Sequence, residues 1–100
     1  MLGEIVRRLV QFYHPERVYL FGSAARGDAS ADSDYDFMVV VSDDTPVEVR
    51  SSPGVFKALL DIDAPIDVLV WRREEFDRRL ELRVSFPSTI VREGKLLYAA

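Results

Sequence analysis

The sequence predicts a single α/β or α+β domain in which helices cover a small mixed β-sheet. Two observations favour this class. Helix-like and strand-like segments alternate along the chain, and the apolar runs at 36–41 and 66–71 have the length of buried strands. One hundred residues, 48% of them apolar and 30% charged, suffice for one modest core. We therefore expect one domain over residues 1–100.

The first half of the chain begins with an amphipathic helix. Apolar residues recur at helical spacing from Leu2, and the helix is expected to end near His14 and Pro15, because a residue before proline avoids helical angles. The lone His14 at this helix end is interpreted as structural rather than catalytic. The following elements are a strand at 17–21, about one helical turn at 23–27, a loop of small residues at 28–33 and a buried strand at 36–41.

The second half continues the alternation and closes with a helix and a short strand. Its expected elements are a turn at 42–46, a loop at 51–54, a weak helix at 55–60, a strand at 66–71, a charged helix at 73–80, a helix at 87–92 and a strand at 96–98. Gly94 is expected to cap the C-terminus of the last helix. The predicted order is therefore α-β-α-β-α-β-α-α-β.

Composition excludes several classes of function. A net charge of −4 disfavours free nucleic acid as a partner, because nucleic-acid binding normally requires a basic face. The absence of cysteine excludes disulfides and cysteine-based zinc sites and fits a cytoplasmic protein. Glu4, Arg7 and Arg8 interrupt the first apolar segment, which is therefore no signal peptide. No apolar run approaches the roughly 20 residues that span a membrane.

Two aspartates at the start of the 36–41 strand point to a metal site. Because side chains alternate along a strand, Asp34 and Asp36 face the same way, and Tyr35 faces the opposite way. Two like charges side by side repel each other unless a cation lies between them. Mg²⁺ fits this position, since it prefers oxygen ligands and commonly uses one or two carboxylates with substrate phosphates.

A glycine and a serine lie where the first strand gives way to a helical turn. Gly22 allows a phosphate to approach the backbone, and the first turn of a helix offers unpaired N–H groups. Ser23 can donate its hydroxyl to the same phosphate, although serine also favours the ordinary N-cap position. Arg26 either adds positive charge to the phosphates or faces solvent. The pair Gly22 and Ser23 is the predicted nucleotide-binding element.

A third carboxylate is expected from a neighbouring strand, about 4.8 Å across the sheet. Asp67 is the candidate, because it stands at the beginning of an apolar strand as Asp36 does; Asp61 and Asp63 are competitors from the preceding loop. Three carboxylates could hold two metal ions about 3.5–4 Å apart, activating a hydroxyl and stabilising the leaving pyrophosphate.

The spacing of these residues resembles a known signature. Gly22-Ser23, ten intervening residues and then Asp34-Tyr35-Asp36 are similar to the motif of the polymerase-β-like nucleotidyltransferase superfamily. The resemblance to its minimal, MNT-type branch covers essentially the whole chain. It is carried further by Phe21, Arg26-Gly27, Ser33, Ile66-Asp67-Val68-Leu69 and the final Gly94-Lys-Leu-Leu-Tyr98.

The resemblance implies the fold, the reaction and the site. It implies a polymerase-β-like nucleotidyltransferase fold and Mg²⁺-dependent transfer of AMP from ATP to a hydroxyl, with two ions. It implies that Asp34 and Asp36 bind both metals and the triphosphate, and that Asp67 binds the metal that activates the nucleophile. Gly22 and Ser23 would hold the phosphates. Members of this branch are often antitoxin-like partners of a helical HEPN protein, and some transfer AMP to a tyrosine of that partner.

Two other functions remain open from the residues. The chain could be a non-catalytic nucleotide-binding subunit that masks its partner, or a small-molecule adenylyltransferase such as those that modify antibiotics. A partner surface is expected, because apolar residues near the ends exceed what the core can bury: Leu2, Val84, Phe86 and Leu97. A HEPN-type protein is the expected partner, with a homodimer as the alternative. The aromatic residues Phe12, Trp71 and Phe76 are expected in the core.

Overall fold

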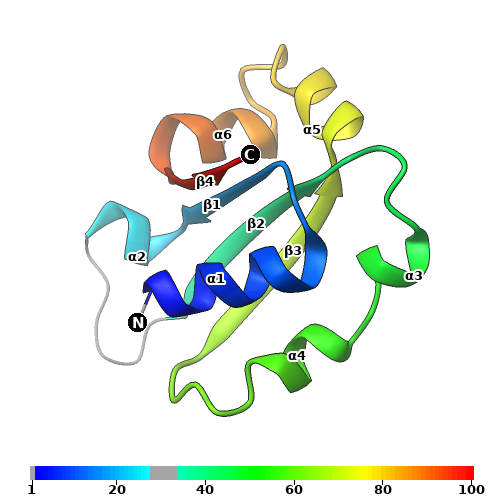
Figure 1. Ribbon diagram of the computed structural model, residues 1–100. Coiled ribbons are helices and arrows are strands. Elements are labelled where there is room, and N and C mark those ends of the chain that lie inside the picture. Colours follow the sequence, from blue (N-terminus) through cyan, green and yellow to red (C-terminus); the bar gives the residue numbers. More distant parts are fainter. Residues whose placement is uncertain (1, 28–33) are drawn as a thin grey trace.

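Within residues 2–27 and 34–100, which this computed structural model describes, four strands form one mixed sheet (Figure 1). The strands are β1 (Arg17–Phe21), β2 (Tyr35–Val41), β3 (Ile66–Arg72) and β4 (Lys95–Ala99), and their order in the sheet is β3-β2-β1-β4. β1 is antiparallel to both β2 and β4, whereas β2 and β3 are parallel. The predicted class is confirmed. The loop expected at 28–33 lies outside the described residues.

Helices cover both faces of the sheet. They are α1 (Leu2–Tyr13), α2 (Ser23–Arg26), α3 (Val47–Arg50), α4 (Gly54–Ala58), α5 (Arg73–Arg79) and α6 (Phe86–Glu93). α1 and α4 contribute to the core on one face, and α5 and α6 to the core on the other. The expected order is confirmed except for α3, which was not predicted. Because α3 has only four residues and no buried side chain, it leaves no apolar period in the sequence.

The larger core lies between the sheet and the pair α1 and α4. From α1, Ile5 and Leu9 are fully buried, at the spacing that predicted an amphipathic helix. They pack with Phe37 and Val39 of β2 and with Val55 of α4. This layer fixes one face of β2, so the alternate residues of that strand must point to the other face.

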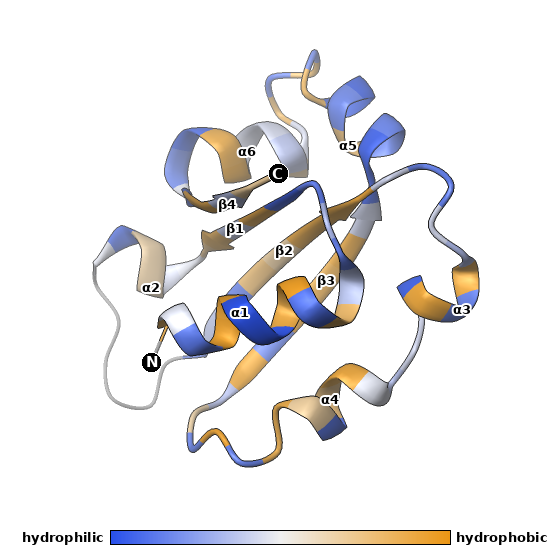
Figure 2. Ribbon diagram, in the orientation of Figure 1, coloured by the Kyte–Doolittle hydropathy of each residue, from blue (hydrophilic) through white to orange (hydrophobic). Residues whose placement is uncertain are grey.

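The smaller core lies under α5 and α6. Phe76 of α5 and Ile90 of α6 are buried against Met38 and Val40 of β2. Phe76 stacks on Tyr19, with ring centroids 5.5 Å apart. The prediction that β2 is buried on both faces is confirmed, and Figure 2 shows its ribbon as hydrophobic along most of its length, whereas α5 is mainly hydrophilic. Of the other aromatic residues expected in the core, Trp71 and Phe12 are partly buried.

Two helix ends differ in their conformation. α1 ends at Tyr13 as expected, and His14 takes a left-handed conformation (φ 48°) while its N–H donates to the Val10 carbonyl. Gly94 is the C-cap of α6 as expected, and its N–H donates to the Ile90 carbonyl at 2.7 Å, but its backbone is extended (φ −89°, ψ −174°) rather than left-handed. A side chain is excluded there for another reason: a Cβ would lie 2.6 Å from the carbonyl oxygens of both Ile90 and Leu20. α6 therefore packs closely on β1.

The apolar residues near the chain ends divide into two groups. Leu2 and Leu97 pack partly against the larger core. Val84 and Phe86 remain 94% and 40% exposed, as expected for a contact surface. Among the described residues, no helix has the length and apolar character that crossing a membrane requires.

Candidate active site

Two carboxylates lie side by side at one end of the sheet. Asp36 of β2 is the register partner of Asp67 of β3, and on its other side Asp36 pairs with Phe21 of β1. We call Asp36 and Asp67 the acid row. Neighbouring strands are about 4.8 Å apart, so both side chains rise from the same face of the sheet at short range. The sequence-based expectation that Asp67 stands across the sheet from Asp36 is confirmed as a position; its role stays a prediction.

The face on which the acid row lies follows from the burial of β2. Phe37 and Val39 belong to the core under α1 and α4, whereas Met38 and Val40 belong to the core under α5 and α6. Asp36 therefore shares the α5–α6 face with Met38 and Val40. Asp34 immediately precedes β2 and is exposed, so alternation brings it toward the same face.

The carboxylates of the acid row and Asp34 are close enough to affect one another's charge. The pKa of Asp36 is raised from its ordinary value of 3.8, mainly because the carboxylate is partly buried, and further because of Asp67 and then Asp34. The three predicted carboxylates thus share one electrostatic environment. A cation or a proton at this position would relieve the repulsion.

Gly22 closes the acid row on the side of β1. Its backbone (φ 77°, ψ −158°) lies in a region that is essentially limited to glycine. A Cβ at this position would collide with the Asp36 carboxylate, so the glycine backbone and that carboxylate are in direct contact. The Gly22 carbonyl accepts hydrogen bonds from the N–H groups of Ala25 and Arg26, both at 3.2 Å. This turn places the predicted phosphate-binding residue directly beside the predicted metal-binding residue.

Ser23 begins the helical turn that follows. The N-cap of α2 is Gly22, so the alternative that Ser23 is an ordinary N-cap is wrong. Ser23 is partly exposed one residue from the glycine that touches Asp36. Arg26 is exposed in the last turn of α2, before Gly27 ends the helix in the left-handed conformation. Nucleotide binding by Ser23 and Arg26 stays a prediction.

Of the competing aspartates, Asp61 has a structural role. Its carboxylate is paired with the Arg8 guanidinium, which lowers the pKa of Asp61. Arg8 also donates to the Ala58 carbonyl at 3.0 Å and pairs with Glu4 at 2.7 Å. The bonds from Arg8 to Ala58 and Asp61 join α1 to the end of α4 and the residues after it, on the far face of the sheet. Asp63 is exposed in the loop before β3, outside the acid row.

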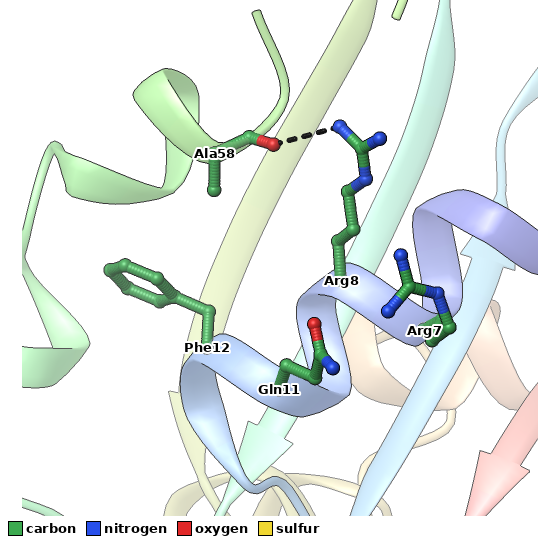
Figure 3. A pocket seen from close by; sticks show the side chains of 5 residues that line it. All are labelled: Arg7, Arg8, Gln11, Phe12 and Ala58. Atoms are coloured by element: carbon green, nitrogen blue, oxygen red, sulfur yellow. Dashed lines mark hydrogen bonds between the residues drawn. The ribbon is translucent and has the colours of Figure 1, made fainter. Parts of the chain in front are cut away.

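A hollow of about 420 Å³ lies on that far face (Figure 3). Its lining residues are Arg7, Arg8, Gln11, Phe12 and Ala58. Figure 3 shows Arg8 directed at the carbonyl of Ala58 across the space between the helices. Because the two arginines already pair with Glu4 and Asp61, the hollow offers an anion little uncompensated positive charge. The chemistry suggested by the sequence lies at the acid row instead.

The row suits a hard cation that shares its ligands with a substrate. As placed, no three His, Cys, Asp or Glu side chains among the described residues form a set that could hold a metal ion. Asp36 and Asp67 nevertheless supply two adjacent carboxylates, and burial together with the neighbouring negative charge raises the pKa of Asp36. Mg²⁺ is commonly bound by one or two carboxylates, with substrate phosphates completing its shell. The donor set therefore fits Mg²⁺ that arrives with a nucleotide.

Two contacts that align the acid row could not be predicted from the sequence. The Tyr35 N–H donates to the Pro65 carbonyl at 2.9 Å, which joins the start of β2 to the segment before β3 and keeps Asp36 level with Asp67. The second contact is that of Gly22 with Asp36, where a Cβ on residue 22 would collide with the carboxylate. Both contacts depend on strand register, which is a long-range property. In the local sequence, these contacts are indicated only by Pro65 and by the pair Gly22 and Ser23.

Comparison with known proteins identifies relatives of this arrangement. A model of the nucleotidyltransferase domain family matches residues 2–97. A protein of Methanocaldococcus jannaschii, provisionally named a protein adenylyltransferase, is 32% identical over 85 residues, which are 83% of this chain and 78% of the relative.

Solved structures share the fold over nearly the full chain. A provisionally named nucleotidyltransferase from Sulfolobus solfataricus has a TM-score of 0.59 at 26% identity, covering 98% of this chain and 77% of that one. A toxin-antitoxin structure with AMP-PNP has a TM-score of 0.57 at 20% identity, with coverages of 100% and 75%. A mutant toxin-antitoxin complex, MntA-HpeT, has a TM-score of 0.62 at 20% identity, with coverages of 98% and 73%.

Proposed function

The chain belongs to the nucleotidyltransferase domain family, and we propose that it transfers AMP from ATP to a hydroxyl group of a partner protein. The observation that carries the proposal is the acid row, in which Asp36 lies between Asp67 and the backbone of Gly22. The relative named as a protein adenylyltransferase supports a protein acceptor. The toxin-antitoxin structure with AMP-PNP supports ATP as the nucleotide.

Each residue has a separate task in the proposed reaction. Gly22 and Ser23 bind the β- and γ-phosphates, because the glycine lets phosphate oxygens approach the backbone and the serine can donate its hydroxyl. Asp34 and Asp36 would hold the Mg²⁺ ions that accompany the triphosphate, and Asp67 would join them in holding the ion beside the acceptor. Arg26 adds positive charge on the side of the leaving pyrophosphate.

The transfer is an in-line displacement across the strands. The acceptor oxygen, on the Asp67 side, forms a bond to the α-phosphorus while the bond to the β-phosphate oxygen breaks and pyrophosphate leaves on the Gly22 side. The acceptor proton passes to Asp67 or to solvent. Bound Mg²⁺ supplies neutralisation of the phosphate charge and lowers the pKa of the attacking hydroxyl. Positioning and electrostatics are the main contributions of the protein.

We propose that the acceptor is a tyrosine of a HEPN-type toxin and that the chain acts as its antitoxin. The two toxin-antitoxin structures that share the fold support a toxin partner. In the mutant complex, the two replaced aspartates are two positions apart, and Asp34 and Asp36 have the same spacing. The acidic net charge of −4 favours a protein acceptor over free nucleic acid.

The test is a labelling experiment with the purified chain and the product of the neighbouring gene. We expect label from α-labelled ATP, but not from γ-labelled ATP, to appear on a tyrosine of the partner. Asp67→Asn should remove labelling, and Asp63→Asn, an aspartate outside the acid row, should retain it. Binding without labelling would favour a non-catalytic masking subunit. Labelling only of a small molecule would favour the antibiotic-type transferase.

A further inference from the structure

The side chains on the α5–α6 face of the sheet form three successive rows across β1, β2 and β3. Phe21, Asp36 and Asp67 form the first row; Tyr19, Met38 and Leu69 the second; Arg17, Val40 and Trp71 the third. Successive rows on one face are about 6.5–7 Å apart. The acid row is therefore one step along the strands from Leu69.

Phe86, at the start of α6, lies over the second row. Its ring centroid is 5.4 Å from that of Phe21 in the first row and 6.1 Å from that of Trp71 in the third. Phe21 is in the first row on β1, and Trp71 is in the third row on β3. The position midway between them is Met38, in the second row on β2, so a ring that contacts both lies above Met38. Met38 is fully buried. The Phe86 ring thus borders the acid row.

Apolar surface remains exposed at this border. Phe86 is 40% exposed although it contacts two aromatic rings, and Leu69, the register partner of Met38 on β3, is 37% exposed. A single exposed apolar residue is ordinary. Two of them next to crowded carboxylates form a surface with a charged side and an apolar side. A nucleotide has the same two parts, a triphosphate and a base.

The direction of the proposed reaction decides which part of the nucleotide reaches Phe86. This inference rests on the proposed function, in which the reaction axis crosses the strands from Gly22 to Asp67. The ribose oxygen on the α-phosphorus lies off that axis. Along the strands, one direction leads to Leu69 and Phe86; in the other, β2 begins at Tyr35 and the sheet ends. Within the part of the chain that the structure describes, the apolar surface for a base is therefore the one at Leu69 and Phe86.

We propose that Phe86, with Leu69 beside it, is the base-binding surface, and that it selects purine nucleoside triphosphates. The contact is between ring faces and apolar carbon atoms, so it recognises the size of the base. Adenine and guanine nucleotides therefore bind alike, since stacking on an aromatic ring tolerates different bases of one size. Cytosine and uracil nucleotides bind more weakly, because their single rings cover less of the apolar surface.

Trp71 provides a direct reporter of base binding. It is the single tryptophan of the chain, and its ring lies 6.1 Å from that of Phe86. We would titrate the purified chain with MgATP and, in parallel, with magnesium tripolyphosphate, which has no base. Calorimetry gives both affinities and Trp71 fluorescence locates the base. ATP should bind about tenfold more tightly than tripolyphosphate, and only ATP should change the fluorescence strongly.

Variants separate base binding from phosphate binding. Phe86→Ala should weaken ATP binding about tenfold and leave tripolyphosphate binding unchanged. Phe86→Leu removes the aromatic ring but keeps apolar packing against Phe21 and Trp71. If Phe86→Ala unfolds α6, the test uses Phe86→Leu in its place. Phe86→Tyr should restore ATP binding. Val84→Ala is the matched control, because Val84 lies two residues earlier and is 94% exposed.

The outcomes distinguish this inference from the proposed function. Equal affinity for ATP and tripolyphosphate, or an equal loss of both in Phe86→Leu, would overturn the base-binding surface and leave the phosphate and metal site intact. Failure of both probes to bind in the presence of Mg²⁺ would overturn the proposed function, and the base-binding surface with it.

Discussion

At Asp36, burial and the neighbouring negative charges both raise the pKa of the carboxyl group. The carboxylate is partly buried and faces Asp67 and Asp34, and each of these effects raises its pKa above 3.8. The protonated form therefore contributes stability below pH 3.8, and this contribution is lost as the pH rises through the raised pKa of the folded chain. Without a cation, the acid row is a source of instability at neutral pH.

Asp36→Asn should abolish AMP transfer and raise the melting temperature in EDTA at neutral pH. The amide has the shape of the carboxylate but carries no charge, so it removes the repulsion without opening a core contact. The difference in melting temperature between variant and wild type should grow as the pH rises from below 3.8 through the raised pKa. Calorimetry across this range measures it, with Asp63→Asn as control. A variant that is inactive because it unfolds would show that Asp36 is structural.

Gly22→Ala should impair both folding and transfer. The glycine-only backbone costs about 1–3 kcal/mol for any other residue, and the new methyl would displace the Asp36 carboxylate. Denaturant unfolding and the labelling assay measure the two effects. Gly27→Ala is the matched control, since Gly27 also has a positive φ of 81°, but a Cβ there would meet no atom of the described residues within 4 Å. Full activity in Gly22→Ala would separate this glycine from the site.

At the scale of elements, α6 is held at both ends. Its last turn packs on β1 through Gly94. At its start, the Ser85 hydroxyl accepts from the Ser88 N–H at 3.2 Å and donates to the Arg79 carbonyl at 2.5 Å, which joins α6 to the end of α5. These contacts fix the position of Phe86 over the sheet.

Ser85→Ala should lower the free energy of unfolding by about 1 kcal/mol, because it removes an N-cap and a second bond to α5. Chemical denaturation measures the loss. Ser51→Ala is a suitable control, because the Ser51 hydroxyl donates to the Val47 carbonyl at the end of the short helix α3. The free energy of unfolding should fall by only a few tenths of a kcal/mol in this variant. An equal loss in both variants would contradict the anchoring role of Ser85.

Elements with a strong apolar period were predictable from the sequence, and those defined by tertiary contact were not. α1 and β2 bury regular patterns, so their bounds came within a residue or two. The extended backbone of Gly94 follows from the close approach of α6 to β1, which no local pattern records. α3 was not predicted because its four residues make about one helical turn, which is too few for an apolar residue to recur at helical spacing.

In the candidate site, too, local features could be predicted from the sequence and long-range contacts could not. The common direction of Asp34 and Asp36 follows from strand alternation within three residues. The pairing of Asp36 with Asp67 depends on the parallel register of β2 and β3, so Asp61 and Asp63 stayed open until the pairing was known. Phe86 was expected to be exposed, but its place beside the acid row follows only from the packing of α6.

At the scale of the whole molecule, exposed apolar side chains gather around the start of α6. Leu82 is 60% and Val84 94% exposed, in the segment that links α5 to α6. They are followed by Phe86, whose ring contacts Phe21, the register partner of Asp36. An exposed apolar surface of this kind marks a contact site.

We expect the chain to act as part of an assembly. Light scattering of the purified chain, alone and with the product of the neighbouring gene, should detect a complex with that product or a homodimer. Val84→Asp should weaken the association, because it places a charge in the apolar contact. Phe56→Asp changes a residue of α4 that is 50% exposed over the opposite face and serves as control. A strict monomer that adenylylates a small molecule alone would contradict this expectation.

ATP binding should depend on Mg²⁺, because Gly22 and the acid row form one site in which the carboxylates accept a triphosphate only together with a cation. Isothermal titration of ATP into the chain should give binding in Mg²⁺ and none, or far weaker binding, in EDTA. Equal affinity in the two buffers would contradict the account.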